Sequence, residues 1–79
     1  MDTQYDYIRG YRNYSTNQFV VYGFIDVINA GVVEVYDTDT DKFLGTLEDI
    51  NTDMIASLND SDWADFVLGM EYDLIPEYN

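Results

Sequence analysis

The run from Gln18 to Ile28 is the feature that most limits how this chain can fold. It reads Gln-Phe-Val-Val-Tyr-Gly-Phe-Ile-Asp-Val-Ile, so β-branched and aromatic residues dominate it, and these residue types favour strands. A strand points successive side chains to opposite faces. Here both faces are apolar: one carries Phe19, Val21, Ile25 and Val27, and the other carries Val20, Tyr22, Phe24 and Ile28. The pattern therefore predicts a central strand that is at least partly covered on each face.

Two further strands are predicted after this run. Asn29-Ala30-Gly31 favours a tight turn. Residues 32–36 and 43–47 then form strand-like segments on either side of the polar stretch Asp-Thr-Asp-Thr-Asp-Lys. This arrangement predicts a hairpin with a connection of four to six residues.

Residues 4–14 fit either a strand or a helix. Tyr5, Tyr7 and Tyr11 fit a period of two, whereas Tyr7, Tyr11 and Tyr14 fit helical spacing. Gly10 weakens both interpretations.

Helical patterns begin near residue 51. Asn51 or Thr52 can cap a short helix, and Ser61 is expected to cap a second one. The second helix has an apolar stripe at helical spacing, formed by Trp63, Phe66, Val67 and Met70. An edge strand is possible at Leu74-Ile75, ending at Pro76.

This order of elements predicts one domain over residues 1–79. We expect an α+β fold, in which one or two short C-terminal helices pack on one face of a small three- to four-stranded antiparallel sheet. A chain of 79 residues can build one modest core. The expected core members are Phe19, Val21, Ile25, Val27, Val33, Val35, Phe43, Leu47, Ile55, Leu58, Trp63, Phe66 and Val67.

The charge of the chain is strongly negative and unevenly distributed. Sixteen acids face three bases, a net charge of −13. Residues 1–25 contain two acids and two bases, so the whole net charge lies in residues 26–79, where Lys42 is the one base. Self-repulsion of this size opposes compaction. Its retention in a folded domain favours a use for the charge, although solubility alone is the simpler interpretation.

Composition also limits the chemistry. The chain has no cysteine and no histidine, so thiolate chemistry and zinc sites lack their usual ligands. We expect no enzyme, no cofactor and no metal. The N-terminal residues do not resemble a secretory signal, and the longest apolar run is too short to cross a bilayer. A cytoplasmic protein is therefore expected.

The candidate binding residues are acidic clusters. In an extended segment Asp37, Asp39 and Asp41 would lie on one face, about 6.6 Å apart, which is similar to the spacing of phosphates along a nucleic-acid strand. The other predicted contacts are Glu48, Asp49, Asp60, Asp62 and Asp65. A basic groove that binds a phosphate backbone can accept such carboxylates.

Two alternative sites remain open. Residues 37–48 match an EF-hand calcium loop at Asp37, Asp39, Asp41 and Glu48, but Lys42 occupies the glycine position. The N-terminal segment offers Tyr5, Tyr7 and Tyr11, and tyrosine suits protein interfaces. These rings can equally cover the sheet edge or pack with Trp63.

In size and charge over its whole length, the chain resembles the DNA-mimic inhibitors encoded by bacteriophages and mobile elements, which include anti-CRISPR and antirestriction proteins. The resemblance implies stoichiometric inhibition of a basic nucleic-acid-binding protein, such as a CRISPR nuclease or a restriction enzyme, in the bacterial host cytoplasm. A CRISPR effector is the favoured target. We expect a monomer, because a dimer would concentrate the charge, and no direct binding to nucleic acid or membrane, because the field repels phosphates.

Overall fold

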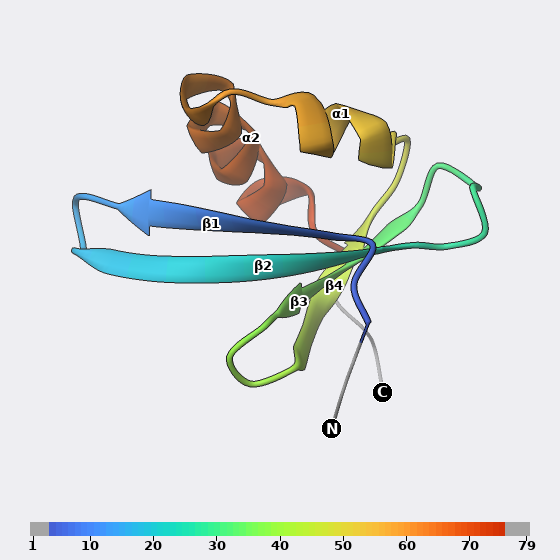
Figure 1. Ribbon diagram of the computed structural model, residues 1–79, viewed down its shortest axis with the longest axis horizontal. Coiled ribbons are helices and arrows are strands. Elements are labelled where there is room, and N and C mark those ends of the chain that lie inside the picture. Colours follow the sequence, from blue (N-terminus) through green and yellow to red (C-terminus); the bar gives the residue numbers. More distant parts are fainter. Residues whose placement is uncertain (1–3, 76–79) are drawn as a thin grey trace.

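The computed structural model describes residues 4–75 of the chain. Its elements are β1 (Tyr7–Asn13), β2 (Gln18–Asp26), β3 (Val33–Asp37), β4 (Lys42–Leu47), α1 (Thr52–Ser57) and α2 (Asp60–Asp73) (Figure 1). The strands form one four-stranded antiparallel sheet, and both helices follow it in the chain. The predicted α+β fold is confirmed, and the segment that was ambiguous between strand and helix is a strand, β1.

The sheet is a simple meander with the strand order β1-β2-β3-β4. The predicted central position of the run from Gln18 to Ile28 is confirmed, because Phe24 of β2 lies between Tyr7 of β1 and Val35 of β3. The strand itself ends at Asp26, two residues earlier than predicted. Beyond β4, Thr46 forms an isolated antiparallel bridge with Ile75. The edge strand expected at this point is therefore a single bridge in the described residues, and its predicted end at Pro76 lies outside them.

A β-bulge interrupts the pairing of β3 with β4 between Val35 and Tyr36. Gly45 lies in this ladder with a φ of 152°, a conformation that side chains with a Cβ rarely adopt. A Cβ there would also lie 3.0 Å from the Ile75 carbonyl oxygen. Glycine therefore allows the last described residues to approach β4 closely.

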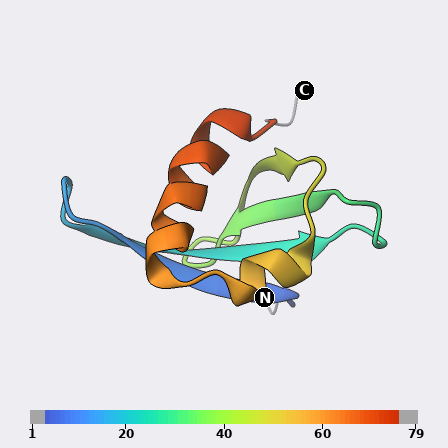
Figure 2. The same cartoon turned by 90° about the horizontal axis from the view of Figure 1, so that it is seen from above.

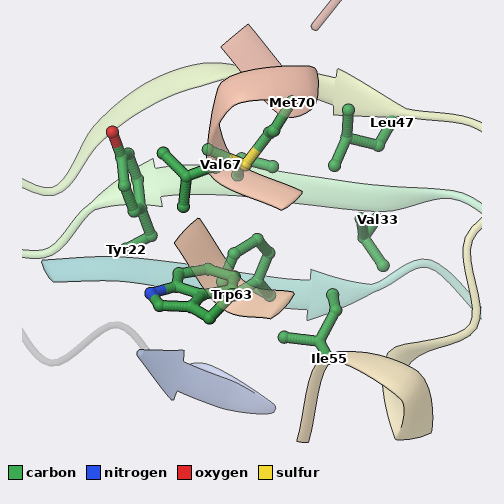
Figure 3. Close-up of a cluster of buried hydrophobic side chains, with 9 residues drawn as sticks. Tyr22, Val33, Leu47, Ile55, Trp63, Val67 and Met70 are labelled. Carbon is green, nitrogen blue, oxygen red and sulfur yellow. The ribbon is translucent and has the colours of Figure 1, made fainter. Parts of the chain in front are cut away.

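Both helices cover the same face of the sheet (Figure 2). The side chains between the two layers form the core (Figure 3): Tyr22, Phe24, Val33, Val35, Leu47, Ile55, Trp63, Val67 and Met70. Three members of the predicted stripe on α2 are buried in it, and Phe66 packs against it.

The predicted core was wrong about the covered face of β2. The helices cover Tyr22 and Phe24, whereas Phe19 is 55% exposed on the opposite face. Val21, Ile25, Val27 and Phe43 are only half-buried. The error has a physical cause: both faces of this strand are apolar, so the alternation predicts a strand but does not say which face the helices cover.

Asparagine caps both helices. Asn51 accepts a hydrogen bond from the Asp53 backbone N–H at 2.9 Å, which confirms one of the two predicted caps of α1. The cap of α2 is Asn59, which accepts from the Asp62 N–H at 2.8 Å, so the prediction of Ser61 was wrong. Asparagine and serine are equally good caps, so residue type did not decide between them. Capping by Asn59 lets α2 begin at Asp60, before Ser61.

Two side chains tie β1 to the helices. The Trp63 indole N–H donates to the Gly10 carbonyl at 2.7 Å. Arg9 donates to the carbonyls of Ile55 at 3.3 Å and Leu58 at 2.9 Å, which lie at the end of α1, and its guanidinium lies 5.1 Å from the centre of the Trp63 ring. The edge strand is thereby held under the helical layer. No helix in residues 4–75 is long and apolar enough to cross a membrane.

Candidate interaction surface

The acids of residues 37–41 lie at the tip of the β3–β4 hairpin. The chain reverses over residues 38–41, within the predicted length of the connection. The Asp37 carboxylate accepts from the Asp39 N–H at 2.9 Å, and Asp41 adopts a φ of 55°. The even spacing of about 6.6 Å predicted for an extended segment is therefore wrong, because Asp39 and Asp41 belong to a turn.

The same geometry argues against a calcium loop. Residues 42–47, the second half of the matching sequence, are paired as β4, and β3 precedes the turn where an EF-hand requires a helix. Among the described residues, no group of three Asp, Glu, His or Cys side chains is placed to hold a metal ion. The Asp-Thr repeat serves turn formation instead: Asp37 accepts from the Asp39 N–H at 2.9 Å, and the Thr40 hydroxyl accepts from the Lys42 N–H at 3.3 Å.

The other predicted acids lie on the surface around the helices. Asp60 and Asp62 occupy the first turn of α2, where the helix dipole stabilises negative charge. Asp65 follows on an exposed face of α2, and Glu48 and Asp49 are exposed in the bend after β4. The predicted contacts therefore lie on three separate parts of the fold: the tip of the β3–β4 hairpin, the bend after β4, and α2.

The structure also contains an acidic hollow that the sequence analysis did not predict. Asp6, Asp26 and Asp53 line it, from the segment before β1, the end of β2 and the start of α1. The Asp26 N–H donates to the Asp6 carboxylate at 2.7 Å, and the Thr52 hydroxyl donates to Asp26 at 3.3 Å. Residues this far apart in sequence meet only through the tertiary fold, so no local pattern could reveal them.

A strained loop forms one wall of this hollow. Ile28 is 90% exposed and has a φ of 54°, a conformation that is rare for a β-branched residue. Asn29 and Gly31 also have positive φ values, and the Ile50 N–H donates to the Gly31 carbonyl at 2.8 Å. The predicted tight turn is confirmed, and its backbone is fixed against the segment before α1.

The N-terminal tyrosines have different environments. Tyr7 and Tyr11 are half-buried against the core, as the packing alternative expected. The Tyr7 hydroxyl donates to Asp53 at 2.9 Å, and this hydrogen bond raises the pKa of Tyr7. Tyr5 lies on the other side of the sheet: its ring covers Gly23, and its hydroxyl donates to Asp41.

The side of the sheet without helices is here called the open face. The pairing register brings Ile8, Val21, Phe19, Tyr36 and Phe43 onto it. Ile8 is 60% exposed and Phe19 is 55% exposed. The alternation of side chains in β1 and β2 could have predicted this apolar surface. It was missed because Phe19 was assigned to the core.

The basic side chains do little to neutralise the acids. Arg9 is bound to backbone carbonyls, and the Arg12 guanidinium lies 5.4 Å from the centre of the Phe19 ring. Lys42 is exposed at the start of β4. Most of the acids in residues 4–75 therefore face solvent without a cationic partner.

Comparison with known proteins adds no relative. No protein-family model, curated protein or solved structure matches the chain.

Proposed function

We propose that this protein is a stoichiometric inhibitor of a nucleic-acid-processing protein, and that its acidic surface occupies the basic groove in which the target holds nucleic acid. A CRISPR effector is the favoured target. The proposal implies a monomer that acts in the cytoplasm of a bacterial host, without a cofactor and without binding nucleic acid itself.

The observation that carries the proposal is the exposed and largely unneutralised negative charge. Most carboxylates lie at the surface, while Arg9 and Arg12 are engaged with carbonyls and a ring. A groove that binds nucleic acid gains affinity by releasing counterions from phosphates. Exposed carboxylates meet the same cationic side chains and accelerate association through long-range attraction.

The predicted acids differ in their local roles. Asp37 and Asp41 accept hydrogen bonds that stabilise the hairpin tip. In residues 4–75, no hydrogen bond or ion pair engages the carboxylates of Asp39, Glu48, Asp49, Asp60, Asp62 and Asp65. Glu48 and Asp65 lie outside the first turns of the helices, so neutralising them changes the charge with little effect on folding and they are suitable for the test.

The first experiment captures bacterial lysate proteins on the immobilised protein at low salt and elutes them with duplex DNA. We expect the eluate to contain a nucleic-acid enzyme whose activity falls to zero near a one-to-one ratio with the added protein. Raising the salt should release the same enzyme, because exposed charges are screened. Capture that resists both salt and nucleic acid would show that the acids do not form the contact.

A pair of variants with equal net charge then locates the contact. Glu48→Gln/Asp65→Asn removes two predicted contacts, whereas Glu71→Gln/Asp73→Asn removes two exposed acids from the other end of α2. We expect the first variant to lower the association rate and the affinity more than the second. Equal losses would indicate that only the total charge matters.

A further inference from the structure

The open face presents an apolar surface that neither α1 nor α2 covers. Helices α1 and α2 both lie on the opposite side of the sheet (Figures 1 and 2). The Tyr5 ring lies over Gly23 on the open face, and the Arg12 guanidinium lies 5.4 Å from the centre of the Phe19 ring. Ile8 and Phe19 are 60% and 55% exposed on this face, whereas Phe24 on the covered face is fully buried.

Aromatic rings extend this surface toward the hairpin tip. The centre of the Tyr36 ring lies 5.8 Å from that of Tyr5 and 5.4 Å from that of Phe43. At the other end the Phe19 ring covers Gly10, where an added Cβ would lie only 2.5 Å from its tip. The glycines of β1 and β2 thus let the rings of Phe19 and Tyr5 approach the backbone of the sheet closely.

Carboxylates lie directly beside these rings. The Tyr36 hydroxyl donates to Glu34 at 3.3 Å, and the Tyr5 hydroxyl donates to Asp41. A Lys or Arg side chain placed there would meet both a carboxylate and an aromatic ring, and each attracts a cation. The open face therefore combines an apolar centre with cation-binding positions at one end.

Charge complementarity selects the occupant. A second copy of the chain would bring −13 against −13, and nucleic acid or an anionic membrane would be repelled in the same way. We propose that the open face docks an apolar patch of a basic protein, whose Lys or Arg side chains contact Glu34 and Asp41 while its apolar side chains cover Ile8 and Phe19. This inference rests on the proposed function, because it assumes a basic partner and names the surface that meets it.

Two synthetic amphipathic helical peptides of equal length and charge test the proposal, one built from Leu and Lys and the other from Ala and Lys. Calorimetry at physiological salt should show that the protein binds the Leu peptide about tenfold more tightly, because Ile8 and Phe19 become buried only against Leu. In an NMR titration with the Leu peptide, the chemical shifts that change should belong to residues of β1, of β2 and of β3 near Tyr36.

Matched variants distinguish this face from other apolar surfaces. Ile8→Ser/Phe19→Ser should abolish the preference for the Leu peptide and leave the affinity for the Ala peptide unchanged. Leu68→Ser/Tyr72→Ser, which alters residues of α2 that are 53% and 89% exposed, should keep the preference. Circular dichroism verifies that each variant is folded, and Ile8→Ser alone serves if the double variant is not.

The outcomes separate the two proposals. If the open-face variant keeps the Leu preference, or if sedimentation shows a dimer that Ile8→Ser/Phe19→Ser dissociates, the docking surface is refuted while the acidic-surface function stands. If neither peptide binds at low salt, both proposals fail.

Discussion

Replacing Trp63 with alanine removes the side chain that joins the helical layer to the sheet. Trp63 is 3% exposed. Its ring stacks on Phe66 with centroids 5.4 Å apart and meets the edges of Tyr22 and Phe24 at 6.4 and 5.9 Å. Its indole N–H donates to the Gly10 carbonyl at 2.7 Å. The substitution therefore removes a core ring, three aromatic contacts and a hydrogen bond to an edge strand.

The expected cost follows from these contacts. Truncating a buried tryptophan to alanine costs about 3–5 kcal/mol. A domain of this length has a total stability of roughly 4–12 kcal/mol, at about 0.05–0.15 kcal/mol per residue. Trp63→Ala should therefore remove about a quarter or more of the free energy of unfolding, and in a protein at the lower end of this range it should prevent folding. Urea denaturation followed by far-ultraviolet circular dichroism measures the loss without depending on the tryptophan signal.

Trp63→Phe separates the ring from its N–H group. A phenyl ring keeps most of the aromatic contacts but leaves the Gly10 carbonyl without its donor, so we expect a loss of about 1–2 kcal/mol. An alanine variant that loses less than about 1 kcal/mol would refute the packing of α2 on β1 and β2. A phenylalanine variant as unstable as the alanine variant would show that the hydrogen bond, and not the ring, holds the layers together.

Three further predictions concern single side chains. Arg9→Lys should cost about 1–2 kcal/mol in urea denaturation, because lysine cannot reproduce the guanidinium fork that binds two carbonyls, whereas Arg12→Lys should change stability by less than about 0.5 kcal/mol. Burial, with the charges of Glu71 and Asp37, raises the pKa of Tyr22 above its ordinary 10.0. The stabilising contribution of the protonated hydroxyl is therefore complete below pH 10 and is lost as the pH rises through the folded-state pKa. Tyr22→Phe should reduce the fall of the urea midpoint above pH 10. Ile28→Asn should raise the melting temperature, because asparagine tolerates the positive φ that strains isoleucine, and an unchanged or lower value would contradict this strain.

The sequence predicted the elements better than their contacts. The β-branched run identified β2, and asparagine before an apolar stripe located the start of α1, because both patterns are local. The covered face of β2 could not be chosen, since Phe19 and Phe24 are equally apolar and the tertiary packing decides between them. The spacing of the tip acids failed because turn chemistry at Asp37 reverses the chain. The acidic hollow required three distant segments to meet, which no local pattern encodes.

Local chemistry explains only part of the negative charge. Asp37 stabilises a turn, and acids in the first turns of α1 and α2 lie where the helix dipole favours them. Glu48 and Asp65 have no such role in the described chain. Solubility alone would explain them, but a surface selected for solubility should not also expose Ile8 and Phe19 together on one face. A basic partner, as proposed above, would account for the exposed carboxylates and for the apolar face that the helices leave open.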